Sequence, residues 1–167
     1  MPPCCSSTTT PARPRRAPPR PPVPDPVPAP APGVLRLVLD AETSAVPLAR
    51  HWSSEVCTRR GLSADALGVL QLLVTEAVAN AVEHGRGPIT VEIACPAADG
   101  VAGPVRVTVH DTEPRLPVLR HVGAMATGGR GVALIDQLAT GWGVREERGA
   151  GKAVWFEVAP GTTWPEV

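Results

Sequence analysis

The longest uninterrupted run of helix-forming residues extends from Ala64 to Glu83, and it constrains the fold more than any other feature of the chain. Ser63 precedes it as a favourable N-cap, and His84-Gly85 ends it. Its apolar residues recur every three or four positions and form one stripe, which has to be buried against another layer. The sequence therefore predicts a long core helix, whose buried stripe consists of Leu67, Leu70, Val74, Ala77, Val78 and Ala81.

Three polar side chains, Glu76, Asn80 and His84, are spaced by four residues along the same helix. Each step of four advances the helix by roughly 40°, so the three side chains form one band that borders the apolar stripe. Taken alone, such a band is more typical of a solvated helix face. Its neighbours, however, are small or apolar, and asparagine is a poor helix former that needs a reason to lie mid-helix. The pattern therefore favours a helix that lines a cleft.

The remaining elements place most strands late in the chain. Before the long helix we expect a strand over 34–39 and a helix over 43–60, in which Leu48, Trp52 and Val56 are spaced by four. After it the pattern predicts strands over 89–94 and 105–110, a helix over 132–139, and hairpin strands over 142–147 and 153–158. Helices cannot alternate with each strand in this order. The fold class is therefore α+β, a two-layer α/β sandwich with helices on one face of a mixed, mostly antiparallel sheet.

The first 33 residues differ from the rest in composition. They contain thirteen of the chain's 21 prolines and almost no large apolar side chain. Proline fixes φ and removes a backbone donor, so residues 1–33 are predicted to be a disordered, extended leader. Docking of this leader on an aromatic groove or an acidic surface stays open as an alternative. The folded domain is expected over 34–160, with a short tail over 161–167.

Composition and charge exclude several classes of function. The chain of 167 residues is 43% hydrophobic and 19% charged, which is enough to bury a core. Sixteen basic and sixteen acidic residues leave no net field toward nucleic acid or an anionic membrane. We find no apolar run approaching membrane length, no secretory signal, and no zinc-ligand spacing among the four cysteines. We therefore expect a cytoplasmic protein that does not bind nucleic acid directly.

Two further features suggest an anion-binding site. The strand that ends at His110 delivers Asp111 into a loop, although an aspartate there can equally cap a turn. The run Gly128-Gly129-Arg130-Gly131 precedes the helix that is expected to begin at Val132. Glycines before a helix N-terminus let backbone N–H groups approach a phosphate. A glycine run alone is weak evidence, because many are flexible loops, but the three features together are more specific.

In this arrangement the chain resembles the GHKL, or histidine-kinase-like, ATPase domain. The stretch from Val74 to Gly85 is similar to the N box of that family, and Asp111 opens the first glycine box. Gly128 to Leu134 resembles the second glycine box, and Gly151 to Glu157 resembles the closing strand. Within the family the chain is similar to the bacterial anti-sigma factor serine kinases of the SpoIIAB and RsbW type. The resemblance covers about residues 34–158 and implies a Bergerat ATP-binding fold.

The resemblance implies a role for each matching residue. Asn80 would help to hold the Mg²⁺ that bridges the phosphates of ATP, and Asp111 would accept a hydrogen bond from the adenine amino group. Glu76 would be the catalytic base that activates a hydroxyl on a partner serine or on water. The segment between Leu116 and Thr127 would be a lid. The residues implied around the phosphates are His84, Gly128, Gly129, Arg130, Gly131 and Val132.

The resemblance also implies partners and leaves alternatives open. It implies a serine/threonine kinase that uses ATP and Mg²⁺, phosphorylates an anti-anti-sigma factor protein, sequesters a sigma factor and is compatible with a homodimer. The chain departs from the family pattern at Thr112-Glu113-Pro114-Arg115, where glycines are typical, and at Ala153, where a hydroxyl residue is common. Two alternatives are therefore a nucleotide-sensing binding module with little or no catalysis, and an interaction protein that has lost nucleotide binding.

Overall fold

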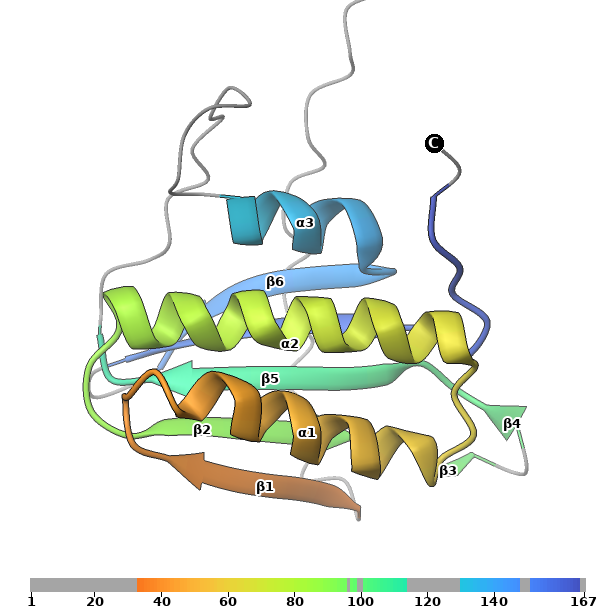
Figure 1. The fold of residues 1–167 in the computed structure, drawn as a ribbon, viewed down its shortest axis with the longest axis horizontal. Helices are drawn as coiled ribbons and strands as arrows, with labels where there is room; N and C mark the ends of the chain where they lie inside the picture. Colours follow the sequence, from red (N-terminus) through yellow and green to blue (C-terminus); the bar gives the residue numbers. More distant parts are fainter. Residues whose placement is uncertain (1–32, 96, 99–100, 114–129, 148–150, 166–167) are drawn as a thin grey trace, which may run out of the picture.

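The computed structural model describes residues 33–95, 97–98, 101–113, 130–147 and 151–165. The expected proline-rich leader and the expected lid lie outside these residues. Three helices lie over one face of a five-stranded sheet (Figure 1). The elements are β1 (Val34–Leu39), α1 (Ala45–Thr58), α2 (Ala64–His84), β2 (Ile89–Ala94), β3 (Ala97–Ala98), β4 (Val101–Ala102), β5 (Val105–Asp111), α3 (Arg130–Leu138), β6 (Gly141–Glu146) and β7 (Lys152–Val158).

The topology confirms the predicted fold class. The main sheet has the strand order β1-β2-β5-β7-β6, and the helices share one face of it. Each pairing in it is antiparallel, so the described sheet is antiparallel rather than mixed. The small hairpin of β3 and β4 is absent from the sequence prediction, because strands of two residues carry no recognisable alternation.

The core lies between α2 and the sheet. Ser63 caps α2 as predicted, since its side-chain oxygen accepts a hydrogen bond from the backbone N–H of Ala66 at 3.2 Å. The predicted apolar stripe is buried except for Leu67, which is partly exposed. Alternate residues of β2 and β5 face the helices, as expected for strands with one buried face. The buried strand residues are Ile89, Val91, Ile93, Val105, Val107 and Val109.

Helix α1 contacts the core through only some of the large apolar residues that are spaced by four along it. Leu48 is 54% exposed, although the sequence pattern grouped it with Trp52 and Val56. The buried face instead contains the small residues Ala45 and Ala49, both at most 1% exposed. Small side chains let α1 pack close against α2, because little volume separates the two backbones. The period of four correctly predicted the helix, and two of its three residues contact the core: Val56 is buried and Trp52 packs against it.

The length and mean hydropathy of α2 match those of a membrane-spanning helix, which the sequence analysis did not foresee. It is the one helix in the described part of the chain with this property. In the structure it lies between α1 and α3 over the sheet, and several of its residues are fully buried (Figure 1). The apolar character of α2 is therefore accounted for by its position in the core.

Cys57 and Cys95 are free and buried. Burial, reinforced by the neighbouring Cys95, raises the pKa of the Cys57 thiol to about 12. Because the thiolate is the reactive form, this shift disfavours reaction of the thiol at neutral pH.

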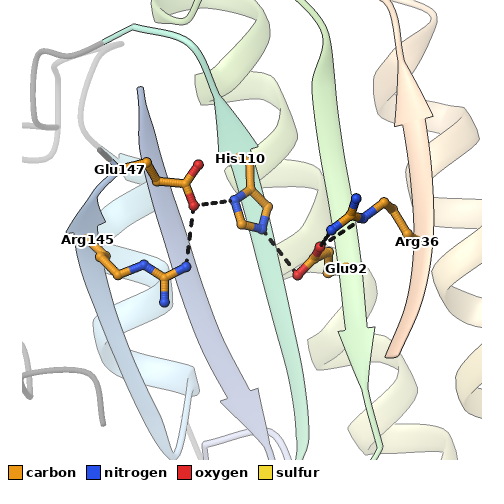
Figure 2. Close-up of polar contacts among 5 residues, drawn as sticks. All are labelled: Arg36, Glu92, His110, Arg145 and Glu147. Carbon is orange, nitrogen blue, oxygen red and sulfur yellow. Dashed lines mark hydrogen bonds and ion pairs between the residues drawn. The ribbon is translucent and has the colours of Figure 1, made fainter. Parts of the chain in front are cut away.

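The sheet face away from the helices carries a chain of charged groups that extends across the sheet from β1 to β6 (Figure 2). On β1, Arg36 donates from Nε to Oε1 of Glu92 at 2.9 Å. His110 on β5 lies between two carboxylates: its Nδ1 is 2.8 Å from Oε1 of Glu147, and its Nε2 is 3.3 Å from Oε2 of Glu92. The second contact has the distance of an ion pair without hydrogen-bond geometry. Arg145 completes the chain at 3.3 Å from Glu147.

We predict that Leu70→Ala destabilises the protein far more than Leu48→Ala. The substitution is the same and both residues are helical, but Leu70 is fully buried and Leu48 is 54% exposed. The lost burial and the remaining cavity should lower the free energy of unfolding by about 2–5 kcal/mol at Leu70. The change at Leu48 should stay within about 0.5 kcal/mol. Urea denaturation measures both values, and equal losses would contradict the assigned core.

A second prediction concerns acid stability. Burial alone would raise the pKa of Glu92, but the hydrogen bond from Arg36 and the charges of His110 and Arg36 hold it below its ordinary value. A lowered folded-state pKa adds stability that is present above the unfolded-state pKa and is lost as the pH falls through the folded-state pKa. The difference in unfolding free energy between the wild type and Glu92→Gln should therefore shrink below about pH 4.3. Urea midpoints measured between pH 7 and pH 3 test this, and a pH-independent difference would refute it.

Candidate nucleotide-binding site

The ends of two helices and one strand meet at one edge of the sandwich. The C-terminal end of α2, the end of β5 and the N-terminal end of α3 all lie at the left of Figure 1. Helix α2 contacts β5, β7 and α3 directly. The helix that carries Glu76 and Asn80 therefore ends beside the strand that carries Asp111. The fold brings these parts of the predicted site to the same end of the molecule.

Asp111 lies against the C-terminal end of α2. It is the last residue of β5 and only 5% exposed. A Cβ placed on Gly85 would lie 3.0 Å from Cβ and Cγ of Asp111 and 2.3 Å from the carbonyl oxygen of Ala81. Any side chain at Gly85 would therefore displace its neighbours, so glycine at this position permits the close approach of helix and carboxylate.

The carboxylate of Asp111 is paired with Lys152, a residue that the sequence analysis did not assign to the site. The two residues are neighbours across β5 and β7, and Nζ of Lys152 is 3.0 Å from Oδ1 of Asp111. Both side chains are buried, 6% and 3% exposed. The backbone N–H of Glu113 also donates to Oδ1, at 2.8 Å. A signal existed in the sequence, because Lys152 occupies a helix-facing position at the start of the apolar β7.

The polar band of α2 divides into two parts. Glu76 and Asn80 are partly buried. His84 is 61% exposed at its side chain, and its Nε2 is 3.7 Å from the carboxylate of Glu83. The band therefore begins beside the core and ends in solvent. Among the described residues, no hydrogen bond engages the side chains of Glu76 or Asn80, so both groups can bind a ligand.

The chain after Asp111 forms a hydrogen-bonded turn where the family pattern has glycines. The backbone N–H of Thr112 donates to the carbonyl of Arg86 at 2.9 Å, and the Thr112 hydroxyl donates to the same oxygen. Nε of Arg86 lies 3.1 Å from the carboxylate of Glu113, which is 6% exposed. Gly87 has φ of 65°, in the region that favours glycine. These contacts connect the end of β5 to the segment that follows α2.

The predicted glycine loop is only partly described. Gly128 and Gly129 lie outside the described residues. Arg130 and Gly131 already belong to the first turn of α3, two residues earlier than the expected start at Val132. Val132 itself is 7% exposed and packs into the core. Its side chain therefore anchors α3, and the part of this segment available to a phosphate is the backbone at the helix N-terminus.

Comparison with known proteins agrees with this geometry. The model of the histidine kinase-like ATPase domain matches residues 39–158. The chain belongs to this family. It is 40% identical over 90 residues to the uncharacterized protein SCO4941 of Streptomyces coelicolor, an alignment that covers 52% of this chain and 81% of that protein.

A solved structure gives the same fold. The structure of the RsbU and RsbW domains of Rv1364c from Mycobacterium tuberculosis matches with a TM-score of 0.57 and 20% identity. The match covers 80% of this chain and 35% of that structure, so the chain spans about a third of its length. At this identity the likeness supports the fold alone.

The residues at the site fit the ATP that the family implies. Both hydrogen bonds to Asp111 end on Oδ1, and among the described residues no donor contacts Oδ2. The second oxygen can therefore accept a hydrogen bond from an amino group. Lys152 keeps a counter-charge beside the carboxylate, and Gly85 places no side chain against it.

We predict that Gly85→Ala disturbs this end of the fold. The added Cβ would overlap the Ala81 carbonyl and press on Asp111. Relief of the overlap should cost about 1–3 kcal/mol of unfolding free energy. Gly161→Ala is the matched control, since a Cβ there meets nothing within 4 Å. Urea denaturation of both variants measures the difference, and two equally stable proteins would show that Gly85 is not tightly enclosed.

Proposed function

We propose that the protein is an ATP- and Mg²⁺-dependent serine/threonine protein kinase that regulates an anti-anti-sigma factor protein. The observation that carries the proposal is the buried Asp111 with its unused oxygen, placed at the end of the helix that carries Glu76 and Asn80. The family supports ATP as the nucleotide. The partner class follows from the resemblance to anti-sigma factor kinases and from the fold shared with a structure that contains an RsbW domain.

Each side chain would have a separate role in phosphoryl transfer. Bound ATP supplies the phosphoryl group and Mg²⁺ offsets its charge. Asp111 would hold the adenine amino group, while the amide oxygen of Asn80 would be a ligand of Mg²⁺. Glu76, one helical turn before Asn80, would accept the proton of the partner's serine hydroxyl as its oxygen bonds to the γ-phosphorus, while the bond from that phosphorus to the β–γ bridging oxygen breaks and ADP leaves. The backbone N–H groups at the start of α3, near Arg130, would contact the phosphates.

The regulatory output would depend on the nucleotide. In the proposed cycle the ATP form binds a sigma factor, and phosphorylation of the anti-anti-sigma protein controls its release. A cytoplasmic location and a homodimer belong to the same proposal. Sedimentation of the purified protein with and without ATP measures the oligomeric state directly.

One observation favours a second candidate function, a nucleotide-sensing binding module without transfer activity. The first glycine box is replaced by the closed turn of Thr112 and Glu113, and Oδ1 of Asp111 already has two partners. A fixed turn is compatible with nucleotide binding but lacks the backbone freedom of glycine. The two functions differ in phosphate transfer. A binding module would bind its partner in an ATP-dependent manner without transferring labelled phosphate to it.

We predict that Glu76→Gln abolishes phosphate transfer and leaves ATP affinity within about twofold. Loss of a general base typically lowers the rate by about 10²–10⁴-fold, while an amide of equal size preserves the helix. Glu83→Gln is the matched control on the same helix, where the carboxylate is 71% exposed. The measurement uses ATP labelled in the γ-phosphate with a purified anti-anti-sigma protein, together with calorimetry of ATP binding.

The outcomes separate the candidates. Labelling by the wild type and by Glu83→Gln, but not by Glu76→Gln, supports the kinase. Equal labelling by all three proteins removes Glu76 from the mechanism. ATP-dependent partner binding without label from any of them supports the module instead. The absence of ATP binding by the wild type would leave only an interaction protein.

A further inference from the structure

Lys152 is the chain's only lysine, whereas the other fifteen of its sixteen basic residues are arginine. It is also buried, and lysine is among the residues least often found inside a protein. Arginine is the usual choice for a buried ion pair, because its planar group meets a carboxylate with two hydrogen bonds. Lysine offers instead a compact ammonium with three donors. A single lysine at this buried position therefore calls for an explanation beyond charge neutralisation.

In the ion pair, Lys152 has donors without an acceptor and Asp111 has an acceptor without a donor. Among the described residues, Nζ of Lys152 has one partner, Oδ1 of Asp111, which leaves two of its three donors without one. Asp111 likewise has one oxygen without a donor in that part of the chain. An unused donor and an unused acceptor thus lie side by side, on side chains that are 6% and 3% exposed. A ligand that carries an acceptor beside a donor can form hydrogen bonds to both groups at once.

We propose that Lys152 is a specificity-determining residue that reads the adenine base together with Asp111. Adenine has an amino donor at C6, flanked by two ring nitrogens, N1 and N7, that are acceptors. Oδ2 of Asp111 accepts from the amino group, and Nζ of Lys152 donates to one flanking ring nitrogen. This donor and acceptor pair matches adenine, whereas guanine presents an oxygen to the carboxylate. The inference rests on the proposed function and adds to it a second base-reading group.

The position of Lys152 in the fold supports this role. Gly151 precedes it with φ of 143°, and a Cβ there would lie 2.4 Å from the carbonyl oxygen of Asp111. Glycine therefore brings the start of β7 close to the end of β5, where lysine and aspartate are registered opposite each other. The remaining helix-facing residues of β7 are Val154, Phe156 and Val158, all apolar. Lys152 is the one charged group on this face of the strand.

The decisive measurement compares ATP with 1-deaza-ATP and 7-deaza-ATP by calorimetry on the wild-type protein. Each analogue keeps the amino group and replaces one flanking ring nitrogen by carbon. A hydrogen bond from a charged donor should make one of the two bind about 10- to 100-fold more weakly than ATP, while the other binds within about twofold. Equal affinity for all three nucleotides would overturn the proposal and leave ATP binding intact. No binding of ATP at all would overturn the proposed function as well.

Two variants add a direct test of the side chain. Lys152→Met keeps the length of the stem and removes the donors, so it should bind ATP and the sensitive analogue with equal, reduced affinity. If Lys152 only holds Asp111 in place, the variant would weaken ATP and the analogue by the same factor, and the wild-type discrimination would persist. Asp111→Asn is the comparison variant, because it should weaken ATP while the preference for the ring nitrogen remains.

NMR spectroscopy of the wild-type protein tests the proposal without relying on the folding of a variant. In protein labelled with ¹⁵N-lysine, the ammonium group gives one side-chain signal, because the sequence contains one lysine. ATP should shift this signal, and the sensitive deaza analogue should shift it much less. Identical shifts from ATP and from both analogues would place the ammonium away from the base and reject the proposal.

Discussion

Burial of one face of α2 against the sheet fixes where the polar residues of the same helix can lie. Leu70 and Val74 are fully buried, so the rotation of the helix about its axis is set by packing. Glu76 and Asn80 then lie on the border of the core, where both are partly buried. A small rotation of α2 would open cavities in the core, and this cost holds the two side chains at the border of the core.

The ion pair of Asp111 and Lys152 is difficult to explain by stability alone. Two charges have lost water, and their mutual attraction rarely repays this loss in full, so apolar residues of similar volume often serve as well or better. The other helix-facing residues of β5 and β7 are such apolar residues. The ion pair is the polar exception among these helix-facing residues, and it lies beside the C-terminal end of α2. Its position favours a role in ligand recognition, in agreement with the unused oxygen of Asp111.

Local patterns predicted the elements of the fold well, and they failed where tertiary contacts decide. The helical period of α2 and the alternation of β5 extend over many residues, and the structure confirms both elements. Helix α1 was recognised, but the spacing of its large apolar residues did not reveal the buried Ala45 and Ala49, because small alanines leave no strong hydrophobic signal. Lys152 was missed because its pairing with Asp111 depends on register across two strands far apart in sequence. The roles of all the predicted site residues stay predictions, which applies to Glu76, Asn80, His84, Asp111 and residues 128–132.

The closed turn after β5 bears on how this site would bind its ligand. Thr112 is bonded to the carbonyl of Arg86, and Gly87 leaves room for the threonine hydroxyl, since a Cβ there would lie 2.6 Å from it. The carboxylate of Asp111 is therefore held from three directions, by Lys152, by the N–H of Glu113 and by the enclosing Gly85. A carboxylate that is already ordered loses little entropy on binding a ligand, which suits the proposed role of Asp111. Structural change on nucleotide binding should consequently be small at β5 and larger toward the N-terminus of α3, where the phosphates are expected.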